Sequence, residues 1–289
     1  PGQVQMSLMR ELRWVCTLSV VLFGLFAADA TEIGGSTEFA ANVLVSAYPD
    51  SLRPSDVPGE IQWQDGTRLA LDNGIVKADF EDLLNKASIL DQVSVRYPKG
   101  WPFDVALVAA DPGRVRNEAF FRKMYGDSAP SVEAHLIDVA WPAASASGSV
   151  RFTTINGAAK ALAAVRDEIA SLGPEAVRFV SRPNGTFNWR PIAGTQRMSM
   201  HSFGAAIDFD LPKGLSRYWR WDSKDARGYP KALLDDATLG AVVCAFEKQG
   251  FIWGGKWGHY DTVHFEYRPE LLGQNTENNS RLAQKRAER

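Results

Sequence analysis

Two segments of this sequence, RMSMHSFGAAID at residues 197–208 and WGGKWGHYDTVHFE at residues 253–266, hold three of its four histidines. In the first segment, a strand starting at Ala206 would place Asp208 and Asp210 on one face. Ile207 and Phe209 would then lie on the opposite face. The apolar face must pack on a core, so we expect the carboxylate face to line a cleft. The small residues before Asp208 allow another group to approach the backbone closely.

The second segment has the same alternation. Thr262, His264 and Glu266 would share one face of a strand, with apolar residues opposite. Asp261 has the opposite parity to His264, so it belongs to the preceding turn. We therefore expect a second cleft wall, with the Asp261 carboxylate extending over it from a turn.

Histidine nitrogen and carboxylate oxygen together suit zinc. A catalytic zinc site has three protein ligands and one open position for water, and a carboxylate that does not bind the metal takes the proton of this water. The sequence therefore predicts His201, Asp208 and His264 as Zn²⁺ ligands and Asp261 as the general base. Glu266 shares the predicted face of His264 and is expected to orient its imidazole.

These segments also resemble a known family. The patterns S-x-H-x-x-G-x-A-x-D (199–208) and D-x-x-H-F-E (261–266), flanked by FNWRPI (187–192) and GFIWGG (250–255), are similar to those of VanY-like zinc peptidases. That group comprises D-alanyl-D-alanine carboxypeptidases and L-alanyl-D-glutamate endopeptidases. The similarity extends over residues 177–272. It implies the hedgehog/DD-peptidase α+β fold, cell-wall peptide substrates, and the same zinc and acid/base residues, although some relatives have Glu where this chain has Asp261.

The resemblance also implies that Arg190 lies near the scissile carbonyl and stabilises the developing oxyanion. Arg197, four residues before His201, is the rival candidate, and either arginine could instead form a surface ion pair. Ser199, Trp257 and His259 are further candidates for substrate contacts, together with Arg197. Each has a second interpretation: Ser199 as a turn residue, Trp257 as a core residue and His259 as a support for the metal ligands.

Several further residues are expected to be structural. His135 lies far from both segments, and Trp253 either lines the cleft or packs in the core. A serine nucleophile at Ser199 or Ser202 is not supported, because the sequence lacks a Gly-x-Ser-x-Gly elbow. Cys244 follows two valines and is expected to be a small buried residue.

Hydrophobic periodicity and turn residues predict the remaining elements. Helices are expected at 78–89, 116–125, 156–172 (capped by Asn156) and 235–249, and strands at 91–97, 135–141, 149–155 and 177–180. Residues 135–155 should form a hairpin. Residues 31–74 are expected to be an extended lead-in with a strand at 67–71, and 213–230 an aromatic-rich loop. The predicted fold is a single α+β domain with a small antiparallel sheet and packed helices around a zinc cleft.

The first residues have the features of a secretory signal. A basic start at residues 9–13, an apolar run at 14–28 and the small-residue site Ala28-Asp29-Ala30 predict cleavage after residue 30. A membrane anchor is the alternative, but the run is short for a span. We expect residues 31–175 to form the N-terminal part of the exported chain, 176–272 the peptidase core and 273–289 a disordered polar tail.

Composition excludes some classes of partner. The chain has 289 residues, 45% hydrophobic and 23% charged, which is ordinary for a globular protein, and its net charge is −2. Removing residues 1–30 takes away two basic and two acidic residues, so the charge is unchanged. Nucleic acid is not expected as a partner, because phosphate binding needs a basic surface, and no stable membrane insertion is expected after signal cleavage. Cys16 lies in the signal and leaves Cys244 alone, so the exported chain has no internal disulfide.

Taken together, the sequence predicts an exported, periplasmic zinc metallopeptidase that hydrolyses peptidoglycan stem peptides. A D-alanyl-D-alanine carboxypeptidase is the first expectation, and an L-alanyl-D-glutamate endopeptidase is the alternative within the family. The same residues are also compatible with a cell-wall-binding module without activity, or with a peptidase for another exported substrate.

Overall fold

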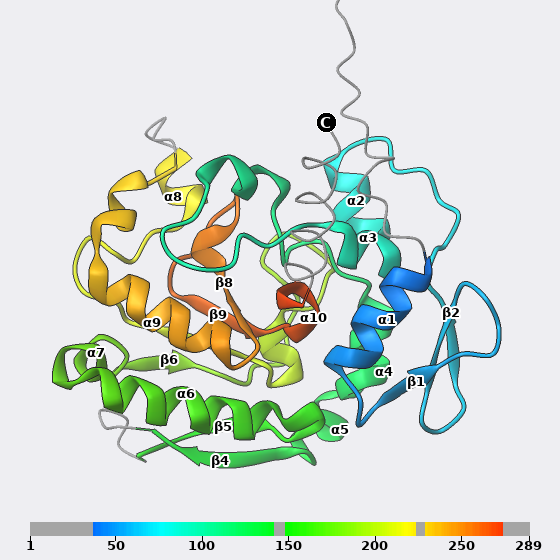
Figure 1. The fold of residues 1–289 in the computed structure, drawn as a ribbon, viewed down its shortest axis with the longest axis horizontal. Helices are drawn as coiled ribbons and strands as arrows, with labels where there is room; N and C mark the ends of the chain where they lie inside the picture. The colour runs from blue at the N-terminus through cyan, green and yellow to red at the C-terminus, as the bar shows by residue number, and fades with distance from the viewer. Residues whose placement is uncertain (1–36, 142–147, 224–228, 274–289) are drawn as a thin grey trace, which may run out of the picture. The chain divides into compact units, whose positions relative to one another are not determined.

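The computed structural model describes residues 37–141, 148–223 and 229–273 (Figure 1). The predicted signal peptide and all but the first residue of the predicted polar tail lie outside these residues. Residues 37–273 belong to one compact unit, and a hydrophobic core of side chains from Ala40 to Tyr267 runs through it. No helix among the described residues is long and apolar enough to cross a membrane.

The N-terminal half contains helices and two small antiparallel sheets. Its helices are α1 (Thr37–Ala47), α2 (Phe80–Lys86), α3 (Ile89–Ser94), α4 (Glu118–Tyr125), α5 (Ala129–Glu133), α6 (Ala158–Leu172) and the 3-10 helices η1 (Val105–Ala110) and η2 (Ile155–Gly157). The first sheet is formed by β1 (Leu52–Pro54), β2 (Glu60–Trp63) and β3 (Arg68–Ala70), and the second by β4 (Leu136–Ala140) and β5 (Ser149–Thr153).

The C-terminal half is built around a four-stranded antiparallel sheet of order β6-β7-β9-β8. Its strands are β6 (Pro183–Gly185), β7 (Ala206–Phe209), β8 (Phe251–Trp253) and β9 (His264–Tyr267). The helices of this half are α7 (Pro174–Phe179), η3 (Met200–Phe203), α8 (Trp219–Ser223), η4 (Lys231–Asp235), α9 (Ala237–Lys248), η5 (Gly254–Lys256) and α10 (Pro269–Leu272).

Helix α9 covers the apolar face of this sheet. The Phe246 ring stacks on Phe265 of β9 with centroids 4.0 Å apart and lies edge-on to Phe209 of β7. Helix α6 packs between α9 and the β4–β5 hairpin, so the elements lie in successive layers (Figure 1). Because side chains alternate along a strand, burying Phe209 and Phe265 turns Asp208 and His264 to the other face. The α+β class and the small antiparallel sheet are confirmed.

Several elements are where the periodicity predicts them. Helices α4, α6 and α9, the β4–β5 hairpin and strands β7 and β9 are confirmed, and α2 is a shorter form of the helix expected at 78–89. Their ends have physical causes: the Asp236 carboxylate accepts a hydrogen bond from Leu239 N and starts α9. Strand β9 begins only at His264, so Thr262 lies in the preceding turn and not on the strand face.

Two expected strands are wrong. Residues 91–97 do not form a strand: Ser88 and Asp91 form a capping box that starts α3, and this helix continues to Ser94. Residues 177–180 fall mostly in α7, which begins at Pro174. A proline ends the preceding helix, but its restricted φ also suits the first turn of a new one. In both cases a local capping signal prevailed over a short apolar alternation.

Three further expectations are corrected. Residues 31–74 are not only an extended lead-in: they also contain α1, β1 and β2, whereas the strand expected at 67–71 is present as β3. Asn156 does not cap α6, since it adopts φ +53° in η2 and its side chain instead accepts a hydrogen bond from Ser51. Cys244 is exposed, because the helical period of α9 turns it away from buried Val242 and Val243. The loop 213–230 also contains the short helix α8.

Gly204, which ends η3 just before β7, offers a test of this packing. Its φ is +61°, and a Cβ atom would overlap Cδ2 of Leu136. Gly148 has nearly the same φ, +62°, but open space around it. We expect Gly204→Ala to lower the free energy of unfolding by about 1–3 kcal/mol more than Gly148→Ala, because only the former overpacks the core. Urea denaturation of both variants measures this difference, and equal losses would contradict the contact.

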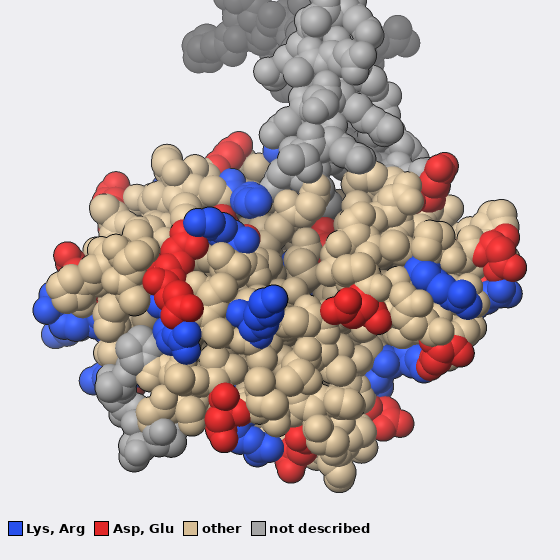
Figure 2. Space-filling model, turned by 60° about the horizontal axis from the view of Figure 1, so that its bottom comes forward, with Lys and Arg blue, Asp and Glu red and all other residues tan. Residues whose placement is uncertain are grey.

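Charges of both signs are mixed on one face of the molecule (Figure 2). On the face shown in Figure 2, Lys and Arg side chains lie close to Asp and Glu side chains, and uncharged residues cover most of the area.

Candidate metal centre

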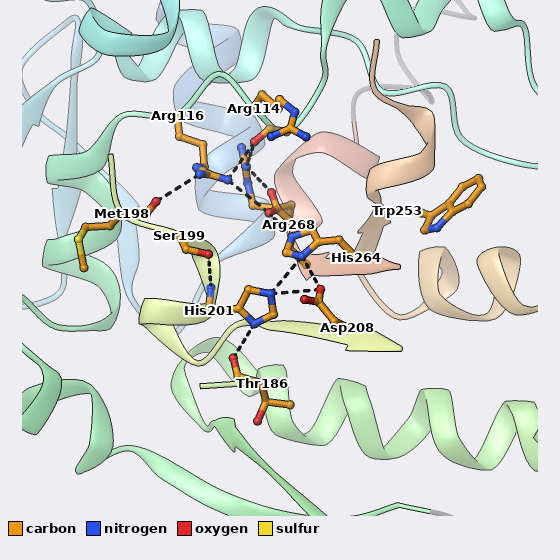
Figure 3. A network of polar contacts seen from close by, with 12 residues as sticks. Arg114, Arg116, Thr186, Met198, Ser199, His201, Asp208, Trp253, His264 and Arg268 are labelled. Carbon is orange, nitrogen blue, oxygen red and sulfur yellow. Dashed lines mark hydrogen bonds and ion pairs between the residues drawn. The ribbon is translucent and has the colours of Figure 1, made fainter. Parts of the chain in front are cut away.

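Three side chains with metal-binding atoms meet on the polar face of the central sheet. Asp208 of β7 and His264 of β9 are direct partners in the antiparallel register, so their side chains lie side by side on one face. His201 comes from η3, which precedes β7 in the chain. The side chains of His201, Asp208 and His264 point toward one another (Figure 3).

The spacing of the donor atoms suits a small tetrahedral metal ion. Nδ1 of His264 lies 2.9 Å from Oδ1 of Asp208. Nε2 of His201 lies 3.2 Å from that oxygen and 3.2 Å from Nδ1 of His264. Ligand bonds of about 2.0–2.1 Å in a tetrahedral zinc site place two donors about 3.3 Å apart. The three residues therefore fit a metal site in their present positions.

The second nitrogen of each imidazole has a partner. Nδ1 of His201 lies 2.9 Å from the carbonyl oxygen of Thr186, and Nε2 of His264 lies 2.9 Å from Oε2 of Glu266. Both partners accept hydrogen bonds, so the remaining nitrogen of each ring is free to bind a metal. The expected orienting contact of Glu266 is present.

The charges around the three donors favour a positive charge at the site. Burial alone would lower the pKa of His264, but hydrogen bonds and charges from Asp208 and Glu266 outweigh it and raise the pKa to about 10. Burial would raise the pKa of Asp208, but its hydrogen bonds to the two histidines hold it well below 3.8. Without a metal, the site thus stabilises a proton on His264. A metal ion must displace that proton, so binding tightens as the pH rises.

Glu266 connects the site to the N-terminal half. It is fully buried, and besides His264 it contacts Nη1 of Arg268 at 3.0 Å and Nη1 of Arg116 at 3.3 Å. Burial would raise the pKa of Glu266, but Arg116, His264 and Arg268 lower it to about 2, so the carboxylate is ionised. Figure 3 shows both arginines beyond His264.

The network continues from Arg268 to two helices of the N-terminal half. Nε of Arg268 contacts Oε1 of Glu270 at 2.5 Å, and Glu270 accepts hydrogen bonds from Tyr48, just after α1, and from Gln92 of α3. All four side chains are buried. Helices α1 and α3 are thereby joined to the residue that orients a metal ligand.

Asp261 lies in the turn before β9, as expected. It lines the same cavity as the three donors, of about 410 Å³. Burial raises the pKa of Asp261, Asp208 adds to this rise, and the charge of His264 opposes it. A carboxylate with a raised pKa accepts a proton more readily, as a general base requires.

Close backbone packing positions the Asp261 turn. Asp261 N donates to the carbonyl of Gly254 at 3.0 Å, and a Cβ on Gly254 would approach the Asp261 carbonyl oxygen to 2.5 Å. On its other side, Asp261 forms an isolated antiparallel bridge with Tyr218. Thr262 also holds this turn by donating its hydroxyl to Leu215 and accepting a hydrogen bond from Arg217 N. The segments WGG and 215–218 therefore hold the backbone of this turn in place.

Two arginines that line the cavity were not predicted from the sequence as site residues. Arg114 and Arg116 follow the 111–113 turn and line the cavity together with the donor residues. Nε of Arg114 donates to the His259 carbonyl at 2.9 Å, and its guanidinium lies over the Trp257 ring. Desolvation lowers the pKa of Arg114, and Asp261 is the charge that most opposes this. The turn was recognised, but no local pattern indicates that it packs against residues 257–266.

The structure places the two candidate arginines in different cavities. Arg190 is exposed and lines the cavity, whereas Arg197 lines a neighbouring groove. Ser199 lines the cavity and also has the expected structural role, because its Oγ accepts the His201 backbone N–H and caps η3.

Of the aromatic and histidine candidates, some line the metal cavity and others do not. Trp257 is buried, yet it lines the cavity and contacts the His264 ring. Trp253 packs in the core, with its Nε1 donating to Thr262 O. His259 lies outside the donor cluster and is paired with Asp111. The side chain of His135 is exposed and away from the cavity.

With this geometry in place, comparison with known proteins gives one match. Residues 193–267 match a family model described as D-alanyl-D-alanine carboxypeptidase. The matched segment, about a quarter of the chain, contains all three donors and Asp261. This is the family that the motifs resemble, and that resemblance is confirmed. No curated protein and no solved structure matches the chain.

Proposed function

We propose that this protein is an exported zinc metallopeptidase that removes the terminal D-alanine from peptidoglycan stem peptides. The observation that carries the proposal is the set of three donors at tetrahedral spacing beside a carboxylate that does not belong to the set. A purely structural site would need neither an open cavity nor a nearby base. The family match supports the substrate class, and the basic and apolar pattern of residues 9–30 supports export.

His201, Asp208 and His264 would hold the ion. When bound, Zn²⁺ polarises the scissile carbonyl and lowers the pKa of a water molecule. Asp261, whose pKa is raised by burial, takes the proton of the attacking water and passes it to the leaving amine. Glu266 keeps the His264 ring in the orientation that binds metal.

Cations in the cavity suit the charge that develops on the carbonyl oxygen. Arg190 lines the cavity from the segment before His201 and keeps the role expected of it, stabilising the oxyanion. Arg114 donates a hydrogen bond to the His259 carbonyl, and its positive charge interacts with the Asp261 carboxylate. We infer that Arg114 maintains the ionised form of Asp261 while Arg190 contacts the substrate.

The test is product analysis with defined muropeptides. The zinc-loaded protein should release one D-alanine from a pentapeptide muropeptide, detected by mass spectrometry, and a chelator should stop the release until Zn²⁺ is added back. Cleavage between L-alanine and D-glutamate would indicate an endopeptidase instead. Peptidoglycan binding without any product, or release that a chelator does not affect, would refute the proposal.

A further inference from the structure

A second and larger cavity adjoins the metal centre. It has a volume of about 1080 Å³ and shares Arg114, Ile192 and Tyr218 with the metal cavity. A volume of this size accommodates a ligand much larger than a dipeptide end. We call this cavity the outer groove. Its lining also includes Phe80, Glu81, Glu118, Arg197, Trp219 and His259.

One wall of the outer groove comes from α2, outside the segment that matches the family. Phe80 of α2 stacks on the His259 ring, with centroids 5.5 Å apart and planes 11° from parallel. Trp219 meets the same ring edge-on at 4.4 Å. The Asp111 carboxylate holds His259 at two points. One oxygen pairs with Nδ1 of the ring, and the other accepts the His259 backbone N–H at 2.6 Å. The outer groove therefore has an aromatic wall formed by Phe80, His259 and Trp219.

Arg197 supplies an incompletely paired cation to the outer groove. Its side chain is half-buried, and its Nε is buried without a hydrogen-bond partner among the described residues. Desolvation lowers the pKa of Arg197, and the positive charge of Arg114 lowers it further. A buried nitrogen without an acceptor is costly, so the Nε of Arg197 favours a ligand that offers an anion or a hydrogen-bond acceptor.

The acidic residues of the outer groove do not fill this need. Glu118 raises the pKa of Arg197, but its oxygens have other partners: one pairs with Arg122 and the other accepts a hydrogen bond from Met198 N. Glu81 raises the pKa of Arg197 less than Glu118 does, and it is exposed in the first turn of α2. A planar guanidinium recognises carboxylates by paired hydrogen bonds, so the ligand chemistry that fits is a carboxylate on an extended chain.

We propose that the outer groove binds an acidic part of the substrate peptide, beyond the residues at the scissile bond, and that Arg197 pairs with its carboxylate. This inference rests on the proposed peptidase function. The substrate class that follows is a long acidic peptide, with the aromatic wall contacting its apolar portion. The enzyme would then select substrates by a wall that its own N-terminal half contributes.

The experiment compares two peptides that differ in one group: an acidic stem peptide and the same peptide with its side-chain carboxylate converted to an amide. Wild-type protein should favour the acidic peptide in kcat/KM by about 10- to 100-fold, the range of a hydrogen-bonded charge pair. In Arg197→Gln this preference should fall toward one, and Arg197→Lys should retain part of it. Arg178→Gln, which removes an exposed arginine from α7 that lines neither cavity, is the control and should keep the wild-type preference.

An unchanged preference in Arg197→Gln, or no preference in wild type, would overturn the inference while leaving the peptidase function intact. If wild type cleaves neither peptide, the proposed function fails instead. In that case the Kd values of the same two peptides, measured by calorimetry, test whether the outer groove binds the carboxylate. Tighter binding of the acidic peptide that is lost in Arg197→Gln supports this inference, and equal Kd values for the two peptides overturn it.

Discussion

Replacing Asp261 by asparagine is expected to lower kcat about 10²- to 10⁴-fold, the contribution typical of a general base, while the metal stays bound. The amide keeps the volume of the carboxylate but cannot accept the proton of the attacking water. Asp261 is not among the three donors, so metal content should be unchanged. Its turn is held by backbone contacts to Gly254 and by Thr262, so the substitution should leave the fold intact.

The measurement pairs turnover of a D-alanyl-D-alanine peptide with metal content by atomic emission. Asp210→Asn is the matched control, because Asp210 lines the same cavity but is exposed and contacts Arg182 and Asn184. The control should retain most of the activity. Turnover by Asp261→Asn at the wild-type rate would remove Asp261 from the role of base, and loss of metal would assign it a ligand role.

The second large effect is expected for His201→Ala, which should weaken metal binding by more than about 100-fold and abolish turnover. Losing a partner of a ligand costs about 10- to 100-fold in metal affinity, so losing a ligand should exceed that range. His201 is the one donor that does not come from a strand, and Ser199 and Gly204 hold its short helix at both ends. Two donors, Asp208 and His264, would remain for the ion.

Competition with a fluorescent zinc chelator measures this affinity. His135→Ala is the control, because the His135 side chain is exposed and outside the donor cluster. Thermal unfolding in the presence of excess chelator separates loss of a ligand from loss of the fold. Zinc affinity equal to that of wild type in a folded His201→Ala protein would exclude His201 from the site.

Local patterns predicted much of the fold. The helical period of α9 and the alternation of β7 and β9 each reflect one face packed on a core, and that demand is visible in the residues themselves. The predictions failed where a helix-start signal decided the structure, as at Ser88 and Pro174, and where short elements have weak periodicity, as in α1, β1 and β2. Cys244 failed for a related reason: apolar neighbours in sequence do not share a helix face.

The sequence alone indicated which residues could form the site. Two histidines and one aspartate follow from their residue types and from the alternation around them, and Asp261 follows from its parity relative to His264. Strand alternation is a local property, so it needs no knowledge of distant residues.

Only the tertiary structure decided which of these groups meet and what surrounds them. The register that pairs Asp208 with His264, the placement of Arg190 and not Arg197 in the metal cavity, and the arrival of Arg114 beside Asp261 all depend on packing between distant segments. Arg114 and the carbonyl it binds are 145 residues apart. A contact over that distance has no period along the chain, because it forms only when separately folded segments pack on one core.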